Sequence, residues 1–224
     1  MPDRKTTRRV AFAATGVANL ASIMAAFRRA GAEPYLAADP EELSDAPFAV
    51  VPGVGAFGAA MAALKAAGMD EAIKARIACR ASTMGVCAGM QLFFDSSEES
   101  PGVAGMGIVP GAFKRFSPSL PVPQLGWNRV WPDDPDQAER SSVGDEPKVP
   151  QGLIRRGWAY FANSYRLTEA PAAYSTSLAE YGETFVAAVE GPGILLCQFH
   201  PELSGPWGLA LIERWLGSTE GGVS

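Results

Sequence analysis

Hydrophobic and polar positions in the first half of the chain alternate between two patterns. Short apolar runs, which predict buried strands, occupy residues 9–14, 34–37, 48–51 and 83–86. Stretches with helical spacing or composition lie between and after these runs, at residues 20–27, 59–67, 70–80 and 89–94. Strands that alternate with helices at this spacing favour a parallel sheet covered by helices on both faces.

The second half of the chain has a different pattern. Strand-like runs separated by turns occupy residues 108–116, 127–131, 158–161, 184–189 and 194–199. An amphipathic helix is expected at residues 205–216, with Leu209, Ile212 and Leu216 on one side. We expect one α/β domain over residues 1–224, with an exposed insertion at residues 132–151, which are rich in Asp, Glu, Ser and Pro.

Composition and charge restrict the classes of partner. The chain has 224 residues, of which 47% are hydrophobic and 19% charged, an ordinary globular composition. A net charge of −5 does not attract phosphate backbones, so nucleic acid is not an expected partner. An uncharged window at residues 46–64 is interrupted by Pro52 and three glycines, which argues against a membrane-spanning helix. Three cysteines without a secretion signal favour free thiols and a cytoplasmic location.

The strongest chemical signal surrounds Cys87. The residues from Gly85 to Gly89 have the form G-x-C-x-G, between a predicted strand and a predicted helix. This is the nucleophile-elbow pattern with cysteine as the nucleophile, where glycines avoid clashes at the sharp turn. The helix that follows would favour thiolate over thiol. The alternative is a small, buried cysteine of the core, which is what most free cysteines are.

A thiol nucleophile needs a base, and the chain contains one histidine, His200. It follows an apolar strand, and Glu202 is close enough in sequence to orient its imidazole. The alternative is a histidine that is merely hydrogen-bonded in the fold. One histidine and scattered cysteines form no ligand cluster, so we do not expect a metal site.

A glycine turn follows the predicted strand at residues 48–51. Gly53 and Gly55 lie in the sequence Pro52-Gly53-Val54-Gly55. Backbone N–H groups in such a turn could stabilise the oxyanion formed when Cys87 attacks an amide carbon. An ordinary connection between a strand and a helix is the alternative.

Taken in order, P-G-V-G, G-x-C-x-G-x-Q and H-P-E resemble the triad-type, class I glutamine amidotransferases. Within that family, the chain looks most like the glutaminase subunits of imidazole glycerol phosphate synthase. The resemblance covers nearly the whole chain. Its further blocks are Ser97-Glu98-Glu99, Gly126-Trp127-Asn128, Tyr160-Phe161, Ser164-Tyr165 and Ser204-Gly205.

The resemblance implies a flavodoxin-like α/β fold with a mostly parallel sheet and added antiparallel strands. It implies hydrolysis of L-glutamine through a thioester on Cys87, with His200 as base and then acid, oriented by Glu202. In the family, the positions of Gly53 and Gly55 form the oxyanion turn. The positions that hold glutamine correspond to Gln91, Glu99, Ser164 and Tyr165. Ammonia would pass to a (β/α)8 cyclase partner that makes imidazole glycerol phosphate, and no cofactor is implied.

Four positions depart from the family pattern, namely Thr15, Gln124, Asn163 and Leu203. In the family, these positions belong mainly to the face towards the synthase and to the route of the ammonia. The sequence therefore supports glutaminase chemistry more directly than the identity of the ammonia acceptor.

Three other functions remain open at this point. A paralogous subunit could supply ammonia to a different synthase in another pathway. A stand-alone thiol hydrolase or peptidase could share the fold, although the H-P-E spacing and Gln91 argue against it. A non-catalytic interaction subunit is disfavoured by the complete set of Cys87, His200 and Glu202.

Overall fold

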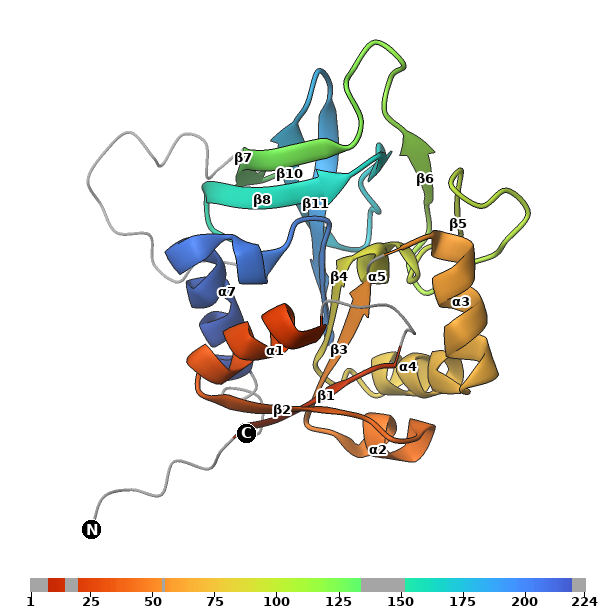
Figure 1. Cartoon of the computed structure of the whole chain (residues 1–224), viewed down its shortest axis with the longest axis vertical. Helices are drawn as coiled ribbons and strands as arrows, with labels where there is room; N and C mark the ends of the chain where they lie inside the picture. The colour runs from red at the N-terminus through yellow and green to blue at the C-terminus, as the bar shows by residue number, and fades with distance from the viewer. Residues whose placement is uncertain (1–7, 15–19, 54, 134–151, 219–224) are drawn as a thin grey trace.

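A twelve-stranded sheet runs through the middle of the protein. The structure is a computed structural model that describes residues 8–14, 20–53, 55–133 and 152–218 (Figure 1). Along the main path of the sheet the strand order is β2-β1-β3-β4-β12-β11-β10-β7-β8, and β5, β6 and β9 lie off this path.

One half of the sheet is parallel. It contains β2 (Ala32–Leu36), β1 (Arg8–Phe12), β3 (Phe48–Gly53), β4 (Thr83–Cys87) and β12 (Ile194–Cys197). This order, with β1 between β2 and β3, is that of flavodoxin-like folds. Ligands of such sheets bind at the carboxyl ends of the strands, and here those ends carry Gly53, Cys87 and the segment leading to His200.

The other half is antiparallel. Its strands on the main path are β11 (Thr184–Gly191), β10 (Ser175–Glu180), β7 (Gln124–Pro132) and β8 (Gly157–Asn163). Three short strands adjoin it, namely β5 (Ser96–Ser97), β6 (Ala112–Arg115) and β9 (Tyr165–Leu167). Of these, β9 pairs antiparallel with β6 and with β11, whereas β5 pairs parallel with β6. The expected α/β fold, a parallel sheet with added antiparallel strands, is confirmed.

Helices cover both faces of the parallel half. The helices α1 (Leu20–Arg29) and α7 (Gly205–Gly217) lie on one face, and α3 (Phe57–Ala66) and α4 (Met69–Ala78) lie on the other (Figure 1). Successive side chains of a strand point to opposite faces of the sheet, so each strand contributes to two separate cores. In β1, Val10 and Phe12 pack with α1 and α7, whereas Ala11 packs with α3 and α4.

Several elements differ from the expectations. The helix expected at residues 89–94 is the single turn α5 (Ala88–Gln91), and the strand expected at residues 108–116 shortens to β6 because Gly111 adopts φ 136°. The sequence pattern missed α2 (Pro40–Asp45), although the side chain of Asp39 caps its N-terminus by accepting from the Glu42 N–H. It also missed β9 and β10.

Most of the expected insertion at residues 132–151 lies outside the described residues, apart from Pro132, which ends β7, and Asp133. None of the helices in the described parts of the chain has the length and apolar character needed to cross a membrane.

Candidate active site

Cys87 lies at a sharp turn between β4 and α5. Its backbone has φ 54° and ψ −119°, a conformation that few residues other than glycine adopt. Here it turns the side chain out of the sheet at the start of the helix, as the nucleophile-elbow pattern predicted. Cys87 is only 8% exposed, so little space is open beside its thiol.

Two glycines allow the chain to make this turn. A Cβ atom on Gly89 would lie 2.0 Å from the carbonyl oxygen of Val51, and one on Gly53 would lie 1.8 Å from the Gly89 nitrogen. The end of β3 therefore rests directly on the backbone of α5. This contact fixes the distance between the glycine turn after β3 and the cysteine.

His200 and Glu202 form a buried pair just after β12. The imidazole Nδ1 lies 2.9 Å from the Glu202 Oε1, and both side chains are less than a tenth exposed. A carboxylate accepts from an N–H, so this contact places a proton on Nδ1 and leaves Nε2 to act on the thiol.

The backbone around His200 is held from two sides. Its N–H donates to the Tyr160 carbonyl at 2.8 Å, and its own carbonyl accepts from the Ser204 hydroxyl at 2.6 Å. The same hydroxyl oxygen accepts from the Tyr160 N–H at 2.9 Å. Ser204 therefore joins the histidine to β8, which forms one wall of the site.

The electrostatics of the site favour a charged imidazole. Burial by itself lowers the pKa of His200, but the hydrogen bonds and charges of Cys87 and Glu202 outweigh it and raise the pKa from 6.5 to about 10. At neutral pH the resting site therefore holds an imidazolium opposite the cysteine, as in other cysteine–histidine pairs that activate a thiol.

Because the chain has one histidine, its titration can be followed by NMR without assignment ambiguity. We expect the ring protons to titrate near pH 10, and at lower pH in Glu202→Gln, which loses the negative charge. The same variant should lower glutamine turnover by roughly 10²- to 10⁴-fold while leaving glutamine binding nearly unchanged.

The pKa shift also predicts a pH dependence of stability. The folded pKa is higher than the unfolded one, so the stabilisation is complete below pH 6.5 and is lost as the pH rises through about 10. The free energy of unfolding should fall across this window in the wild type and less so in Glu202→Gln. A wild-type titration midpoint of the His200 imidazole near pH 6.5 would contradict a charged interaction between His200 and Glu202.

A cavity of about 400 Å³ opens at the thiol. The predicted residues that line it are Gly55, Cys87, Gln91, Glu99, Ser164, Tyr165 and His200. Two predicted residues do not line it: Glu202 is bonded to His200, and Gly53 is packed against α5. Four further residues line it that are not expected site residues from the sequence: Ala56, Ala88, Ala162 and Asn163.

Gln91 and Glu99 are held in place by contacts outside the cavity. The Gln91 Nε2 donates to the Gln198 Oε1 at 3.2 Å, which leaves the Gln91 Oε1 buried and without a partner among the described residues. The Glu99 carboxylate accepts from the Phe57 N–H at 2.6 Å, at the first turn of α3. A carboxylate here is stabilised by the positive end of the helix.

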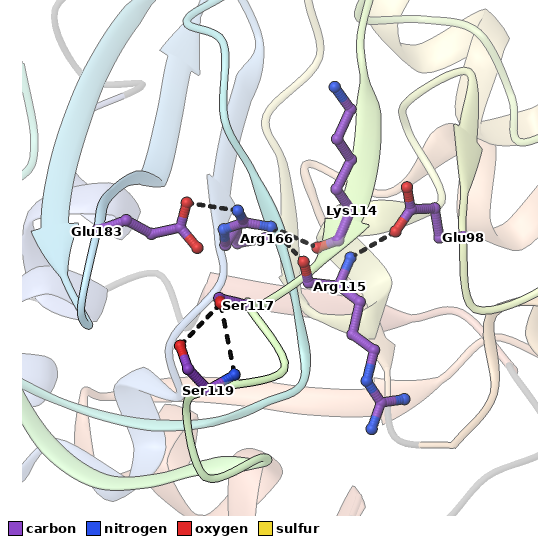
Figure 2. A network of polar contacts seen from close by, with 7 residues as sticks. All are labelled: Glu98, Lys114, Arg115, Ser117, Ser119, Arg166 and Glu183. Atoms are coloured by element: carbon purple, nitrogen blue, oxygen red, sulfur yellow. Dashed lines mark hydrogen bonds and ion pairs between the residues drawn. The ribbon is translucent and has the colours of Figure 1, made fainter.

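The wall formed by residues 162–165 is supported from behind by Arg166. Figure 2 shows its guanidinium between the Glu183 carboxylate and the carbonyl groups of Lys114 and Arg115. In addition, the Phe116 N–H donates to the Ser164 carbonyl at 3.1 Å. These contacts tie β9 to β6 and to the turn between β10 and β11, and they fix the wall that carries Ser164 and Tyr165.

The four departures from the family pattern fall in different places. Gln124 and Asn163 are buried and lie opposite each other in the β7–β8 pair, and Asn163 lines the cavity. Leu203 is 38% exposed. Thr15 lies outside the described residues, as does Val54 of the glycine turn.

Comparison with known proteins identifies the class to which this fold and site belong. The family description "Glutamine amidotransferase class-I" matches residues 21–216. The chain belongs to the class-I glutamine amidotransferase family. Its relatives include the imidazole glycerol phosphate synthase subunit HisH of Symbiobacterium thermophilum, 36% identical over 89% of each chain, and that of Herpetosiphon aurantiacus, 38% identical over 90% of each.

A third relative is a longer chain. The chloroplastic imidazole glycerol phosphate synthase hisHF of Arabidopsis thaliana is 35% identical over 90% of this chain but only 33% of its own length. Solved structures agree on the fold. A glutamine amidotransferase superposes with a TM-score of 0.70 at 17% identity, covering 93% of this chain and 98% of that one. PurLQS from Thermotoga maritima gives 0.70 at 15% identity, covering 96% and 99%.

Proposed function

We propose that this chain is the glutaminase subunit of an imidazole glycerol phosphate synthase. It hydrolyses L-glutamine to glutamate and passes the ammonia to a synthase partner. The observation that carries the proposal is the meeting of Cys87, on its strained turn, with the His200–Glu202 pair at one cavity. The similarity to HisH subunits over nearly the whole chain supports the pathway.

The reaction begins with the Cys87 thiolate, which attacks the carboxamide carbon of glutamine and forms a carbon–sulfur bond. The carbonyl electron pair moves to oxygen, giving a tetrahedral oxyanion. The Nε2 proton of His200 passes to the amide nitrogen, the carbon–nitrogen bond breaks, and ammonia leaves a glutamyl thioester. A water molecule then attacks the thioester carbon while His200 takes its proton, and the thiolate departs, leaving glutamate.

Backbone groups of the elbow and of the glycine turn would hold the oxyanion. The Ala88 N–H follows the nucleophile directly, at the position that serves this purpose in other nucleophile elbows. Gly55, with φ 98°, lines the cavity, and Gly53 anchors the same turn. The substrate itself would contact Gln91, Glu99, Ser164 and Tyr165, which line the remaining cavity wall.

The direct test is a glutaminase assay on the purified chain together with its co-purified native partner. Glutamate and ammonia should appear in equal amounts from glutamine. Asparagine, one methylene shorter, should be a poor substrate because its amide cannot reach Cys87 while its α-amino acid groups occupy the same contacts. The absence of any glutamine hydrolysis in the presence of the partner would refute the proposal.

The face of β7 and β8 beside the cavity suits a large protein partner. Leu125 and Trp127 alternate along this face of β7, and their cross-strand neighbours are Ala162 and Tyr160. Ala162 also lines the cavity, so the face leads to the site. Its large apolar side chains are unusually exposed, at 68% for Leu125, 54% for Trp127 and 55% for Trp158. Exposed aromatic clusters of this kind typically form protein interfaces.

We infer that the (β/α)8 synthase docks on this face. The two HisH relatives are subunits of imidazole glycerol phosphate synthase, and the Arabidopsis synthase carries the matching region within a longer chain. A partner seated here would cover the mouth of the cavity and receive ammonia without its release to water. Without the partner, the ammonia would be lost to water and the glutamine would be wasted.

The free chain should therefore hydrolyse glutamine slowly, and the synthase should stimulate it, because a partner that binds the productive state more tightly shifts the chain towards that state. Trp127→Ala should weaken synthase binding by about 2 kcal/mol, or roughly thirtyfold in Kd. Leu36→Ala, at an exposed apolar position on β2, is the matched control and should not alter binding. Full turnover by the free chain, unchanged when the synthase is added, would contradict the predicted stimulation.

A further inference from the structure

Gln198 is a fully buried amide that the proposed reaction does not use. It follows β12, its backbone N–H donates to the Ala187 carbonyl at 2.9 Å, and none of its surface is exposed. His200 lies two residues further on, and alternate residues of an extended segment point to the same side. Gln198 and His200 therefore face the same region, while Phe199 between them packs in the core.

Each end of the Gln198 amide has a partner. Its Oε1 accepts from the Gln91 Nε2 at 3.2 Å, and its Nε2 donates to the Cys87 Sγ at 3.9 Å. In the described part of the chain this sulfur is the one acceptor of the Gln198 NH₂ group. A buried N–H group without an acceptor is unfavourable, so the amide depends on the sulfur of the nucleophile as its partner.

Gln91 determines which end of the Gln198 amide faces the sulfur. It lies four residues after Cys87, about one helical turn on, which brings its side chain to the same side as the nucleophile. The NH₂ group of Gln91 donates and does not accept, so the Gln198 oxygen faces Gln91 and the Gln198 nitrogen faces Cys87. Turning both amides over would place an oxygen beside the sulfur, which is unfavourable when the sulfur is negatively charged.

The contact distinguishes the two protonation states of Cys87. A thiolate is a strong acceptor, whereas the sulfur of a thiol accepts only weakly. The thiol has another contact, because it can donate to the Ala162 carbonyl oxygen at 3.9 Å, which a thiolate cannot do. The Gln198 N–H therefore favours the thiolate. Both groups are buried, where a dipole acts more strongly on a charge than it does in water.

We propose that Gln198 is a further catalytic residue, which donates its Nε2–H to the Cys87 thiolate while Gln91 holds the amide in the required orientation. This inference rests on the proposed function, because it assigns the thiolate to glutamine hydrolysis. The same N–H stabilises the sulfur twice, before it attacks the carboxamide and when it leaves the thioester. Gln91 is then a positioning residue in addition to lining the cavity for glutamine.

The test measures how the alkylation of Cys87 depends on pH, because the thiolate is the form that reacts with iodoacetamide. The chain with its co-purified partner is alkylated from acid to alkaline pH, and the Cys87 peptide is quantified by mass spectrometry. Gln198→Met keeps the approximate size of the side chain and removes the donor. In this variant the rise of the alkylation rate should move up by about one pH unit. The plateau at high pH should stay within about twofold of the wild type.

Glutamine turnover and a second variant complete the measurement on Gln198. In Gln198→Met, kcat/KM for glutamine should fall by roughly tenfold, with KM little changed. Gln198→Leu gives the same comparison in case methionine does not fit the site. The charged groups near the thiol stay unaltered in both variants, namely His200, Glu202 and Glu99.

Two variants at other glutamines separate the roles. Gln91→Met should move the alkylation rise in the same direction although no glutamine is present, which a residue that only holds the substrate would not do. Gln124→Met is the matched control, because Gln124 is also a buried glutamine but does not line the cavity. Its alkylation profile should match that of the wild type.

The outcomes decide between the inference and its alternatives. A shifted rise with an unchanged plateau supports it. A rise that stays in place in both Gln198 variants would overturn it, whatever happens to the plateau, because Gln198 would then only fill space beside the cysteine. An unmoved rise in Gln91→Met would overturn the positioning role of Gln91. A wild-type protein that is alkylated at Cys87 but hydrolyses no glutamine would overturn the proposed function and leave the contact with Gln198 standing.

Discussion

Replacing Cys87 with alanine should reduce glutamine turnover by about 10⁴-fold or more, because the members of a catalytic triad act as a unit and nothing replaces the nucleophile. The fold should survive, since the side chain loses only its sulfur and the residue is not part of a disulfide. Turnover is measured as ammonia release with the partner present. Circular dichroism and thermal melting establish that the variant is folded.

The other two cysteines serve as matched controls. Cys79 is exposed at the end of α4, and Cys197 is buried in β12, where burial raises the pKa of its thiol well above 9.0. Cys79→Ala and Cys197→Ala should keep most of the activity, and a glutamine-analogue electrophile should label Cys87 alone. Labelling that persists in Cys87→Ala would show that the nucleophile has been misassigned.

Gly89→Ala should damage both the stability and the activity of the protein. The added methyl group would lie 2.0 Å from the Val51 carbonyl oxygen, a backbone atom in a buried strand that cannot give way alone. Either β3 or the elbow must shift. We expect a loss of about 3 kcal/mol in the free energy of unfolding. Turnover should fall by at least about 10²-fold, because a displacement of this size changes the distance between Cys87 and the oxyanion turn.

The matched control is Gly217→Ala at the exposed end of α7, where an added Cβ meets no atom within 4 Å. This variant should be as stable as the wild type or slightly more so, since alanine favours the helix. Chemical denaturation and the glutaminase assay measure both effects. Wild-type stability and turnover in Gly89→Ala would mean that the contact between β3 and α5 does not fix the elbow.

The parallel half of the fold could be predicted because each of its strands is a short apolar run between helical patterns. The antiparallel half was harder. In β10, the sequence Ser175–Glu180 mixes buried and exposed positions with small polar residues, so its strand character depends on its neighbours β11 and β7. The three-residue β9 is shorter than any periodic signal and is defined by its pairing with β6.

The site followed a similar rule. Cys87, His200 and Glu202 can be proposed as site residues from the sequence alone because their spacing carries the chemistry. The sequence marks Asn163 only as a departure from the family pattern, which favours a place on the partner face or the ammonia route. Its burial in the cavity wall depends on the register of β7 against β8, which joins residues about forty positions apart and leaves no local signal.

The departures therefore divide between two roles. Leu203 follows Glu202 at the end of the short 3-10 helix Pro201–Leu203 and is 38% exposed. Two residues further on, a Cβ atom on Gly205 would lie 3.5 Å from the Trp127 ring. Leu203 belongs with the surface to which we assign the synthase. Gln124 and Asn163 are instead buried, and Asn163 lines the cavity. Adaptation of this chain thus concerns both its partner and its pocket.

The central claim is that glutamine is hydrolysed through a thioester on Cys87, and it is tested most directly by trapping that intermediate. The chain, with its native partner, is mixed with glutamine, quenched in acid within milliseconds to seconds, and digested for mass spectrometry. The account predicts a glutamyl group on the peptide that contains Cys87, forming before glutamate appears and absent from Cys87→Ala. Glutamate and ammonia released at the full rate with no acyl group on Cys87, or with the acyl group on another residue, would contradict it.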